Sequence, residues 1–512
     1  MRALIKAVIT VSSFAIISRI ISFFFKIFLS NYLGASNLGV YQVATSIFFV
    51  LVAVTCTGFP LTISKQTAQY HTQLDRATAL RKESKAVTAC IVISIIFSLI
   101  MFGVFAIFGT KMRHLFADEQ TMNVFLLILP ALLAIGFISP IRSALWGRKL
   151  YTTTSILEIV EQLLRIGLCV LFVLLLDYNN LYITAWTFTV SAILTAIICL
   201  IFYYKQGGRL SNPRNQFRPL LVTGIPITAT RISNSIVFML ISLAIPYLFG
   251  RMGLSTTESL YMLGSSMGMA LPLLFVPNTI VGSLAYIMIP TLSQLNPNNP
   301  QMSQQINGAI KISTLVACAF VPAFYVMGQH SGLFLFNNLT TGQFLQSSAW
   351  LLIPIALESI TSSMLNALDL ESRGFFNYCL GSAILFVVMF CFANKFSLQV
   401  FSIAFGLALT ISTILDIISI QRKTKIKLTF VYPMTICLAM VVPTIAFTSN
   451  IYNFLGALTE SRLLQFVRLA TTGISSVCFY IGIIYILDSI GVSTIIATKK
   501  TCKKLAKKPK IV

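Results

Sequence analysis

Apolar residues recur along the whole chain in long blocks, which are separated by short polar segments. Each block approaches the roughly 20 residues that an α-helix needs to cross a bilayer. Because lipid offers no partner to backbone N–H and C=O groups, each block is predicted to be a helix. The pattern predicts about fourteen spans, at 8–31, 38–64, 86–108, 122–146, 155–176, 181–204, 220–249, 260–290, 309–329, 345–368, 375–393, 397–420, 429–449 and 463–488.

The overall composition leads to the same class of protein. Of the 512 residues, 56% are hydrophobic and 10% are charged, whereas a soluble protein carries roughly 25% charged residues. This is too little polar surface to cover a water-soluble globule of this size. The connecting loops are short, so we predict an all-α integral membrane protein without an inserted soluble domain.

The placement of basic residues predicts the orientation. If the N-terminus is cytoplasmic, the even-numbered loops and both termini hold about 26 Lys and Arg, and the opposite side holds about five, which follows the positive-inside rule. Both termini are therefore predicted to be cytoplasmic. A second hypothesis is that the basic tail, Lys499 to Lys510, binds anionic lipids. No folded basic face surrounds these charges, so the sequence does not favour nucleic acid as a partner.

Short motifs recur six spans apart and indicate an internal duplication. The exit of the second span, Gly58 to Lys65, resembles Ile289 to Gln294 at the end of the eighth, and Pro130 in the fourth span corresponds to Pro354 in the tenth. Two similarly oriented lobes with a substrate path between them are typical of transporters. The predicted parts are an N-lobe at 1–205, a C-lobe at 206–425, two further spans at 426–490 and a basic cytoplasmic tail at 491–512.

Several cations lie inside predicted spans, where an ionisable residue costs roughly 2.5–3.5 kcal/mol. Arg19 and Lys26 are seven residues apart and share one face of the first span. Arg231, followed by Asn234, lies in the seventh span, which corresponds to the first under the duplication. These four residues are predicted to bind an anionic substrate in a central cavity, since a guanidinium suits phosphate. The alternative is that each cation bonds helix-end carbonyls or reaches an interface.

The fifth span carries Glu158, Glu161 and Arg165 on one face. Glu161 and Arg165 can form an i,i+4 ion pair, which leaves Glu158 to bind a proton or cation, or to balance the arginines. A purely structural pair is the favoured account. Glu358 and Asp416 also lie in apolar surroundings, and the sequence offers them no partner.

The eighth span contains helix-breaking residues at Gly268, Pro272 and Pro277. Proline removes a backbone donor and kinks a helix, so these residues are predicted to be hinges for alternating access, or equally a static kink.

Motifs for catalysis or metal binding are missing from the sequence. It has no G-x-x-x-x-G-K-[ST] loop, its three histidines lie far apart, and its ten cysteines form no C-x-x-C pair. We predict no enzyme, no metal and no cofactor.

Four motifs in the first part of the chain carry a family resemblance. They are Ser18-Arg19-Ile20-Ile21-Ser22-Phe23, Leu33-Gly34-Ala35, Leu38-Gly39-Val40-Tyr41 and Gly58-Phe59-Pro60…Ser64-Lys65. In this order they resemble the polysaccharide-transporter branch of the multidrug/oligosaccharidyl-lipid/polysaccharide (MOP) flippase superfamily. The Pro272…Pro277…Ile289-Pro290…Ser293 run and Glu161-Gln162…Arg165 are similar to the stage V sporulation protein B group and the lipid II flippases.

The resemblance implies a bacterial plasma-membrane flippase for undecaprenyl-diphosphate-linked saccharides such as lipid II. Arg19 matches the first of the cavity arginines in span 1 of lipid II flippases. Lys26 lies one residue beyond the second position, which Phe25 occupies, and Pro272 and Leu273 stand where a further arginine is expected. The resemblance also implies alternating access driven by membrane potential or by an Na+ or H+ gradient.

Three alternatives remain open from the sequence. The first is a cation-coupled multidrug exporter of the same superfamily, which would favour a carboxylate in the central cavity. The second is a passive channel or scramblase, and the third is a non-transporting membrane scaffold for cell-wall or spore enzymes.

Overall fold

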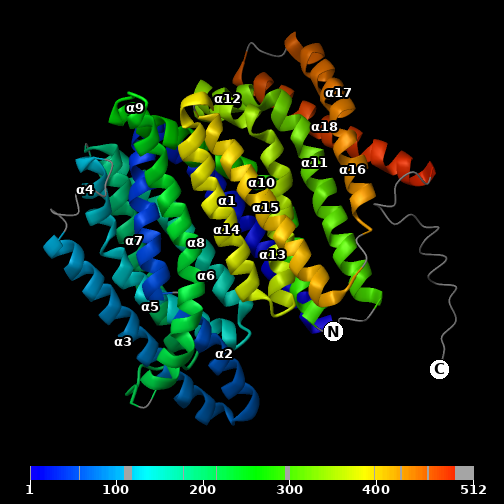
Figure 1. Ribbon diagram of the computed structural model, residues 1–512. Coiled ribbons are helices and arrows are strands. Elements are labelled where there is room, and N and C mark those ends of the chain that lie inside the picture. The colour runs from blue at the N-terminus through cyan, green and yellow to red at the C-terminus, as the bar shows by residue number, and fades with distance from the viewer. Residues whose placement is uncertain are drawn as a thin grey trace, which may run out of the picture. The chain divides into compact units, whose positions relative to one another are not determined.

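The computed structural model describes residues 2–56, 58–108, 118–176, 178–214, 216–293, 300–396, 398–426, 429–457 and 461–490. Within these ranges the chain forms only helices and short connections, with no strand (Figure 1). The predicted all-α membrane class is therefore confirmed.

Among the described residues, ten helices are long and apolar enough to cross a membrane, or eleven if α4 (Glu119–Ile128) and α5 (Ala131–Gly147), bent by 42°, count as one span. The difference from about fourteen has local causes. The first two predicted spans join in one helical run, Ile17–Gln73. Helix α6 (Tyr151–Leu175) carries three charges. In α8 (Phe217–Arg251) the apolar segment among the described residues is Ser235–Arg251, which is shorter than a full span. The count of fourteen is compatible with these helices and stays a prediction.

Helix α1 (Arg2–Cys56) is two helices joined at a single residue, Gly34. A straight helix of 55 residues would be about 80 Å long, far more than the roughly 30 Å of a hydrocarbon core. Gly34 breaks it with φ 73° and ψ 169°, a backbone conformation that a side chain disfavours. The loop predicted between the first two spans is thus reduced to one non-helical residue, and α2 (Gly58–Gln73) follows.

The first compact unit, Met1–Gly268, contains α1 to α9. Its remaining helices are α3 (Arg76–Phe108), α7 (Asn180–Lys205) and α9 (Thr256–Leu263). Helix α1 packs against α4, α6, α8 and α9, and α2, α3, α5 and α7 enclose a core that includes Ile63, Cys90, Ile141 and Leu145.

Glycines allow α1 and α9 to approach closely. A Cβ at Gly39 would lie 2.0 Å from the Leu260 carbonyl oxygen, and one at Gly264 would lie 1.8 Å from that of Ala35. These two backbones can therefore only pack in this way because both positions lack a side chain.

The second unit, Met269–Val512, begins with α10 and ends with α18. Helix α11 packs against α12, α13, α17 and α18, and α13 also packs against α10 and α15. Helices α14 and α15 form a further closely packed pair (Figure 1). The helix bounds are α10 Leu271–Ser293, α11 Pro300–Phe336, α12 Leu339–Ser347, α13 Leu352–Ala367, α14 Glu371–Phe396, α15 Gln399–Thr424, α16 Val431–Ala439, α17 Val441–Phe454 and α18 Arg462–Ile490. Large apolar side chains such as Val387, Val442 and Ile474 are exposed on its surface, as expected for helices that face lipid.

The two units are defined by packing and divide at 268, whereas the predicted lobes are defined by repeated motifs and divide at 205. Helices α8 and α9 pack with the first unit, because α8 contacts α1 and α2. The repeat-based lobes stay a prediction, and the tail at 491–512 lies outside the described residues.

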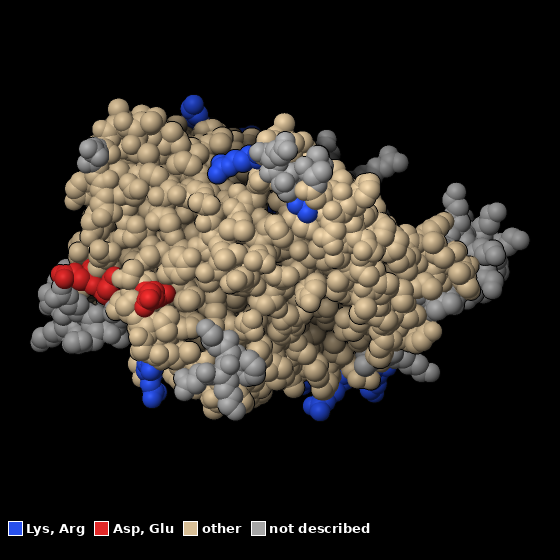
Figure 2. Space-filling model, turned by 90° about the horizontal axis from the view of Figure 1, so that it is seen from above, with Lys and Arg blue, Asp and Glu red and all other residues tan. Residues whose placement is uncertain are grey.

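Figure 2 shows a described surface that is mostly uncharged, with Lys and Arg at several separate places and a small group of Asp and Glu. The orientation in the membrane stays a prediction.

Candidate functional site

A cavity of about 280 Å³ lies within the first unit, between α1, α6 and α7. Its polar wall consists of Ser22, Lys26, Gln42, Thr45, Gln162 and Arg165. Aromatic and aliphatic side chains form the rest of the lining. Among the described residues that line it, two are cations and none is a carboxylate. The cavity can therefore attract an anion.

Lys26 is the cation that α1 contributes to this cavity. It lies eight residues before the break at Gly34 and is partly buried. In the part of the chain that the structure describes, no hydrogen bond or ion pair occupies its amino group. Its amino group is therefore available to a ligand.

Polar contacts fix α6 against α1 beside Lys26. The Ser22 hydroxyl donates to Gln162 Oε1 at 2.9 Å, and Gln162 Nε2 donates to the Ser18 hydroxyl. One glutamine side chain thus bridges two serines that lie about one turn apart on α1. It holds the Arg165 face of α6 toward the cavity.

Arg165 belongs to a three-residue ion network. Its Nη2 donates to Glu161 Oε1 at 2.8 Å, the i,i+4 pair expected from the spacing. Arg142 of α5 donates to the other oxygen, Glu161 Oε2, also at 2.8 Å. The Arg165 guanidinium lies over the Phe188 ring, 4.7 Å from its centroid. Two arginines from α5 and α6 thus share the carboxylate of Glu161 beside the cavity wall.

Arg142 was missed by the sequence reasoning, because its partner lies 19 residues away on the next helix. Glu158 is exposed and is attracted by the charge of Arg142. A role for Glu158, Glu161 and Arg165 in ion coupling stays a prediction.

The other predicted substrate-binding residues are not all brought together. Arg19 is exposed and does not line the cavity. Helix α8, which carries Arg231 and Asn234, packs against α1, but these two side chains lie outside the described residues. The structure therefore groups Lys26 with Arg165 and Gln162, and the cluster with Arg19, Arg231 and Asn234 stays a prediction.

The predicted hinge region contains a π-helix, η2 (Gly264–Ala270), between α9 and α10. Gly268 lies within it and is the last residue of the first unit. Pro272 and Pro277 follow in α10. Segments with π-type hydrogen bonds are rare and frequent at functional sites, but hinge motion at these residues stays a prediction.

Two carboxylates of the second unit, the partly buried Glu358 and the buried Asp416, have partners that the sequence did not reveal. Glu358 of α13 accepts hydrogen bonds from the hydroxyls of Ser412 and Thr413, each at 3.2 Å. Asp416 of α15 accepts from Asn377 Nδ2 at 2.8 Å and from the Thr361 hydroxyl at 3.2 Å. These neutral donors come from three helices that pack together.

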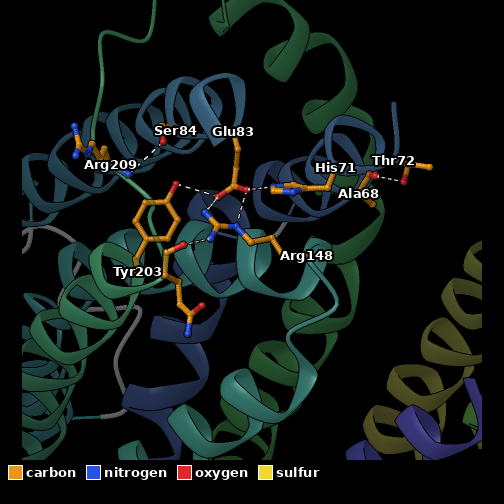
Figure 3. A network of polar contacts seen from close by, with 9 residues as sticks. Ala68, His71, Thr72, Glu83, Ser84, Arg148, Tyr203 and Arg209 are labelled. Carbon is orange, nitrogen blue, oxygen red and sulfur yellow. Dashed lines mark hydrogen bonds and ion pairs between the residues drawn. The ribbon is translucent and has the colours of Figure 1, made fainter. Parts of the chain in front are cut away.

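A buried ion network also ties together one end of the first unit (Figure 3). Glu83, at the start of α3, is fully buried and accepts from Arg148 Nε at 2.7 Å and from Arg148 Nη2. His71 Nε2 lies 2.8 Å from its carboxylate, and the Tyr203 hydroxyl donates to it at 3.1 Å. Arg148 Nη1 continues to the Gln206 carbonyl at 2.8 Å.

This network joins the ends of α2, α3, α5 and α7, all of which lie on the cytoplasmic side in the predicted topology. Sequence reasoning missed it, because Glu83 stands within a basic loop and its partners are up to 120 residues away. Within the described ranges its polar contacts are with one another, with Ser84 and with the Gln206 carbonyl, so we interpret the network as structural.

The sequence profile of a family described as polysaccharide biosynthesis proteins matches residues 4–296, more than half of the 512-residue chain. The chain belongs to this family. Among curated proteins, stage V sporulation protein B of Bacillus subtilis (strain 168) is 21% identical over 438 residues, which cover 82% of this chain and 83% of that protein. Lipid II flippase MurJ of the same organism is 27% identical over 247 residues, 46% of this chain and 44% of that protein.

Solved structures show the same fold. An inward closed conformation of lipid II flippase MurJ matches with a TM-score of 0.72 over 93% of this chain and 99% of that chain, at 14% identity. An inward-facing multidrug resistance MATE transporter of the MOP superfamily matches with a TM-score of 0.64 over 83% and 96%, at 14% identity. The predicted polysaccharide family is therefore confirmed, and the fold is that of MurJ and of MATE transporters of the MOP superfamily. These relatives are named as a flippase and as transporters, and none of them is named as an enzyme.

Proposed function

We propose that this transporter is a flippase for an undecaprenyl-diphosphate-linked saccharide, with the peptidoglycan precursor lipid II as the first candidate. It moves the lipid from the cytoplasmic to the outer leaflet of the bacterial plasma membrane, with both termini in the cytoplasm. The supporting observation is the cavity whose described lining holds two cations and no carboxylate. The names of two curated relatives, a lipid II flippase and a sporulation protein, point the same way.

The diphosphate is the part of the substrate that this cavity suits. Lys26 supplies a mobile point charge, and Arg165 supplies a planar guanidinium held by Glu161. At about 280 Å³ the cavity is slightly smaller than ordinary ligand sites of roughly 300–1,000 Å³. A saccharide therefore requires a more open conformation, which is consistent with alternating access. Arg19, Arg231 and Asn234 complete the proposed binding set, and the polyprenyl chain stays in lipid.

Energy for the cycle comes from the membrane potential or from an Na+ or H+ gradient. Glu158 is the proposed coupling group, because it is exposed and acidic next to the Arg142–Glu161–Arg165 network. Anionic lipids are proposed partners of the basic tail.

A multidrug exporter is the alternative that the MATE fold suggests. The cavity does contain aromatic side chains, including Phe25, Tyr41 and Phe188. Lys26 and Arg165 would however repel the cationic compounds that an aromatic pocket otherwise attracts. An anionic substrate therefore fits the lining of this cavity better than a cationic one.

The test measures how much lipid II is accessible at the outer leaflet of cells that depend on this protein as their flippase. Lys26→Ala is expected to abolish growth and accessibility at normal protein levels, whereas Lys26→Arg retains both because the charge is kept. Lys205→Ala is the matched control, since Lys205 is an exposed lysine at the end of α7, outside the cavity. Normal accessibility with Lys26→Ala would refute the role of the cavity, and normal accessibility after depletion of the whole protein would refute the lipid II assignment.

A further inference from the structure

A second cavity, of about 320 Å³, lies within the second unit between α11, α17 and α18. Three polar residues of its lining, Arg462, Gln465 and Arg468, follow one another at intervals of three along α18. This spacing places them on one helical face. His330 of α11, Asn337 just after α11 and Tyr452 of α17 complete the polar wall.

Arg468 is held in place without losing its charge. Its Nε and Nη2 both donate to the Tyr452 carbonyl oxygen, at 3.2 and 2.8 Å, and its guanidinium lies over the Tyr452 ring at 3.8 Å. These partners are neutral. The cation is therefore oriented before any ligand arrives, which lowers the cost of binding one.

Arg462 adds a second positive charge at the edge of the same cavity. Its side chain is exposed, and within the described ranges it makes no ion pair or hydrogen bond. No carboxylate occurs among the lining residues that the structure describes. The two guanidinium groups are thus not neutralised there.

The position of the cavity favours a lipid over a soluble anion. It lies where α17 ends at Phe454 and α18 begins at Arg462, so it is at the depth of the headgroups if these helices span the membrane. Apolar side chains next to it are strongly exposed, with exposed fractions of 86% for Phe454, 72% for Leu463 and 56% for Phe466. Acyl chains can cover these side chains while a headgroup reaches the arginines.

We propose that this cavity binds the phosphate of a lipid headgroup, on the side of the membrane opposite the cytoplasm in the predicted topology. Arginine forks suit phosphate through charge-assisted hydrogen bonds. The positive-inside rule does not account for two arginines in one cavity on the side that is poor in Lys and Arg. The phosphate can come from a bulk anionic phospholipid or from the diphosphate of the transported lipid, and this second source rests on the proposed function.

The experiment compares lipid binding to the full-length protein and to Arg462→Gln in native mass spectrometry. The probes are phosphatidylglycerol and undecaprenyl diphosphate, each titrated in the same detergent. Arg462 is chosen because it supports no described contact of the fold. The control is Arg251→Gln, since Arg251 is an exposed arginine at the end of α8, on the same predicted side but outside the cavity.

Arg462→Gln is expected to weaken binding of at least one probe by about tenfold, as for the loss of one charged hydrogen bond, while Arg251→Gln leaves both unchanged. Weaker binding of both probes assigns the cavity to phosphate-bearing lipids in general, independently of what is transported. Weaker binding of undecaprenyl diphosphate alone assigns it to the transported lipid. Unchanged binding of both probes by Arg462→Gln, at a normal melting temperature, would overturn the proposal.

Discussion

Glu83→Gln is expected to destabilise the first unit by about 3–5 kcal/mol, the range measured when one partner of a buried ion pair is removed. The Glu83 side chain is 0% exposed and that of Arg148 is 7% exposed, so water cannot replace the lost charge. The carboxylate accepts two contacts from Arg148 and one each from His71 and Tyr203. A glutamine has the same shape but offers a single acceptor oxygen. Its amide N–H groups would face the hydrogen-bond donors that the second carboxylate oxygen now accepts from.

The assay is thermal unfolding of the purified protein in detergent. A loss of this size corresponds to a fall in melting temperature on the order of 10 °C for a unit of this length. Glu371→Gln is the control, because Glu371 is exposed in the first turn of α14 and a surface change of this kind stays within about 0.5 kcal/mol. The double variant Glu83→Gln with Arg148→Met should recover part of the lost stability, because it leaves no buried arginine without an ion-pair partner. A melting temperature for Glu83→Gln equal to that of the control would refute this reasoning.

Two further substitutions test packing and charge in the same assay. Gly264→Ala is expected to lower stability by about 1–3 kcal/mol, because its Cβ would lie 1.8 Å from the Ala35 carbonyl oxygen. The control Gly250→Ala has open space around it and should be neutral or stabilising. Equal effects of the two substitutions would mean that the two helices separate freely. Asp416→Asn is expected to stay within about 1 kcal/mol of the unmodified protein, because its described partners are neutral and the Thr361 hydroxyl can accept from the new amide. A loss as large as that of Glu83→Gln would instead show that Asp416 balances a cation.

The sequence predicted what depends on local pattern and missed what depends on packing. Apolar blocks of spanning length and the i,i+4 spacing of Glu161 and Arg165 can be read along one helix, and both appear in the structure. Arg142 could not be paired in advance, because its contact with Glu161 requires α5 and α6 to pack at a particular rotation. The same holds for Glu83, whose partners come from three other helices.

The break in α1 was missed for a different reason. The sequence between the first two predicted spans contains polar residues and Gly34, which favoured a loop. In the structure one glycine with positive φ redirects the chain, and helix resumes at once. A tight break and a short loop have the same composition, so only the backbone distinguishes them.

The π-helix at Gly264–Ala270 has a geometric consequence for everything that follows it in the chain. Its i→i+5 hydrogen bonds accommodate more residues per turn than an α-helix does. If such a segment takes up or releases one residue, the helix beyond it turns by about 100° and advances by about 1.5 Å. Tightening η2 into regular α-helix would therefore rotate α10, with Pro272 and Pro277, about its own axis and shift it along that axis without bending the chain. A register change of one residue is a smaller rearrangement than unfolding a turn, and it is available at the residue where the two units meet in sequence.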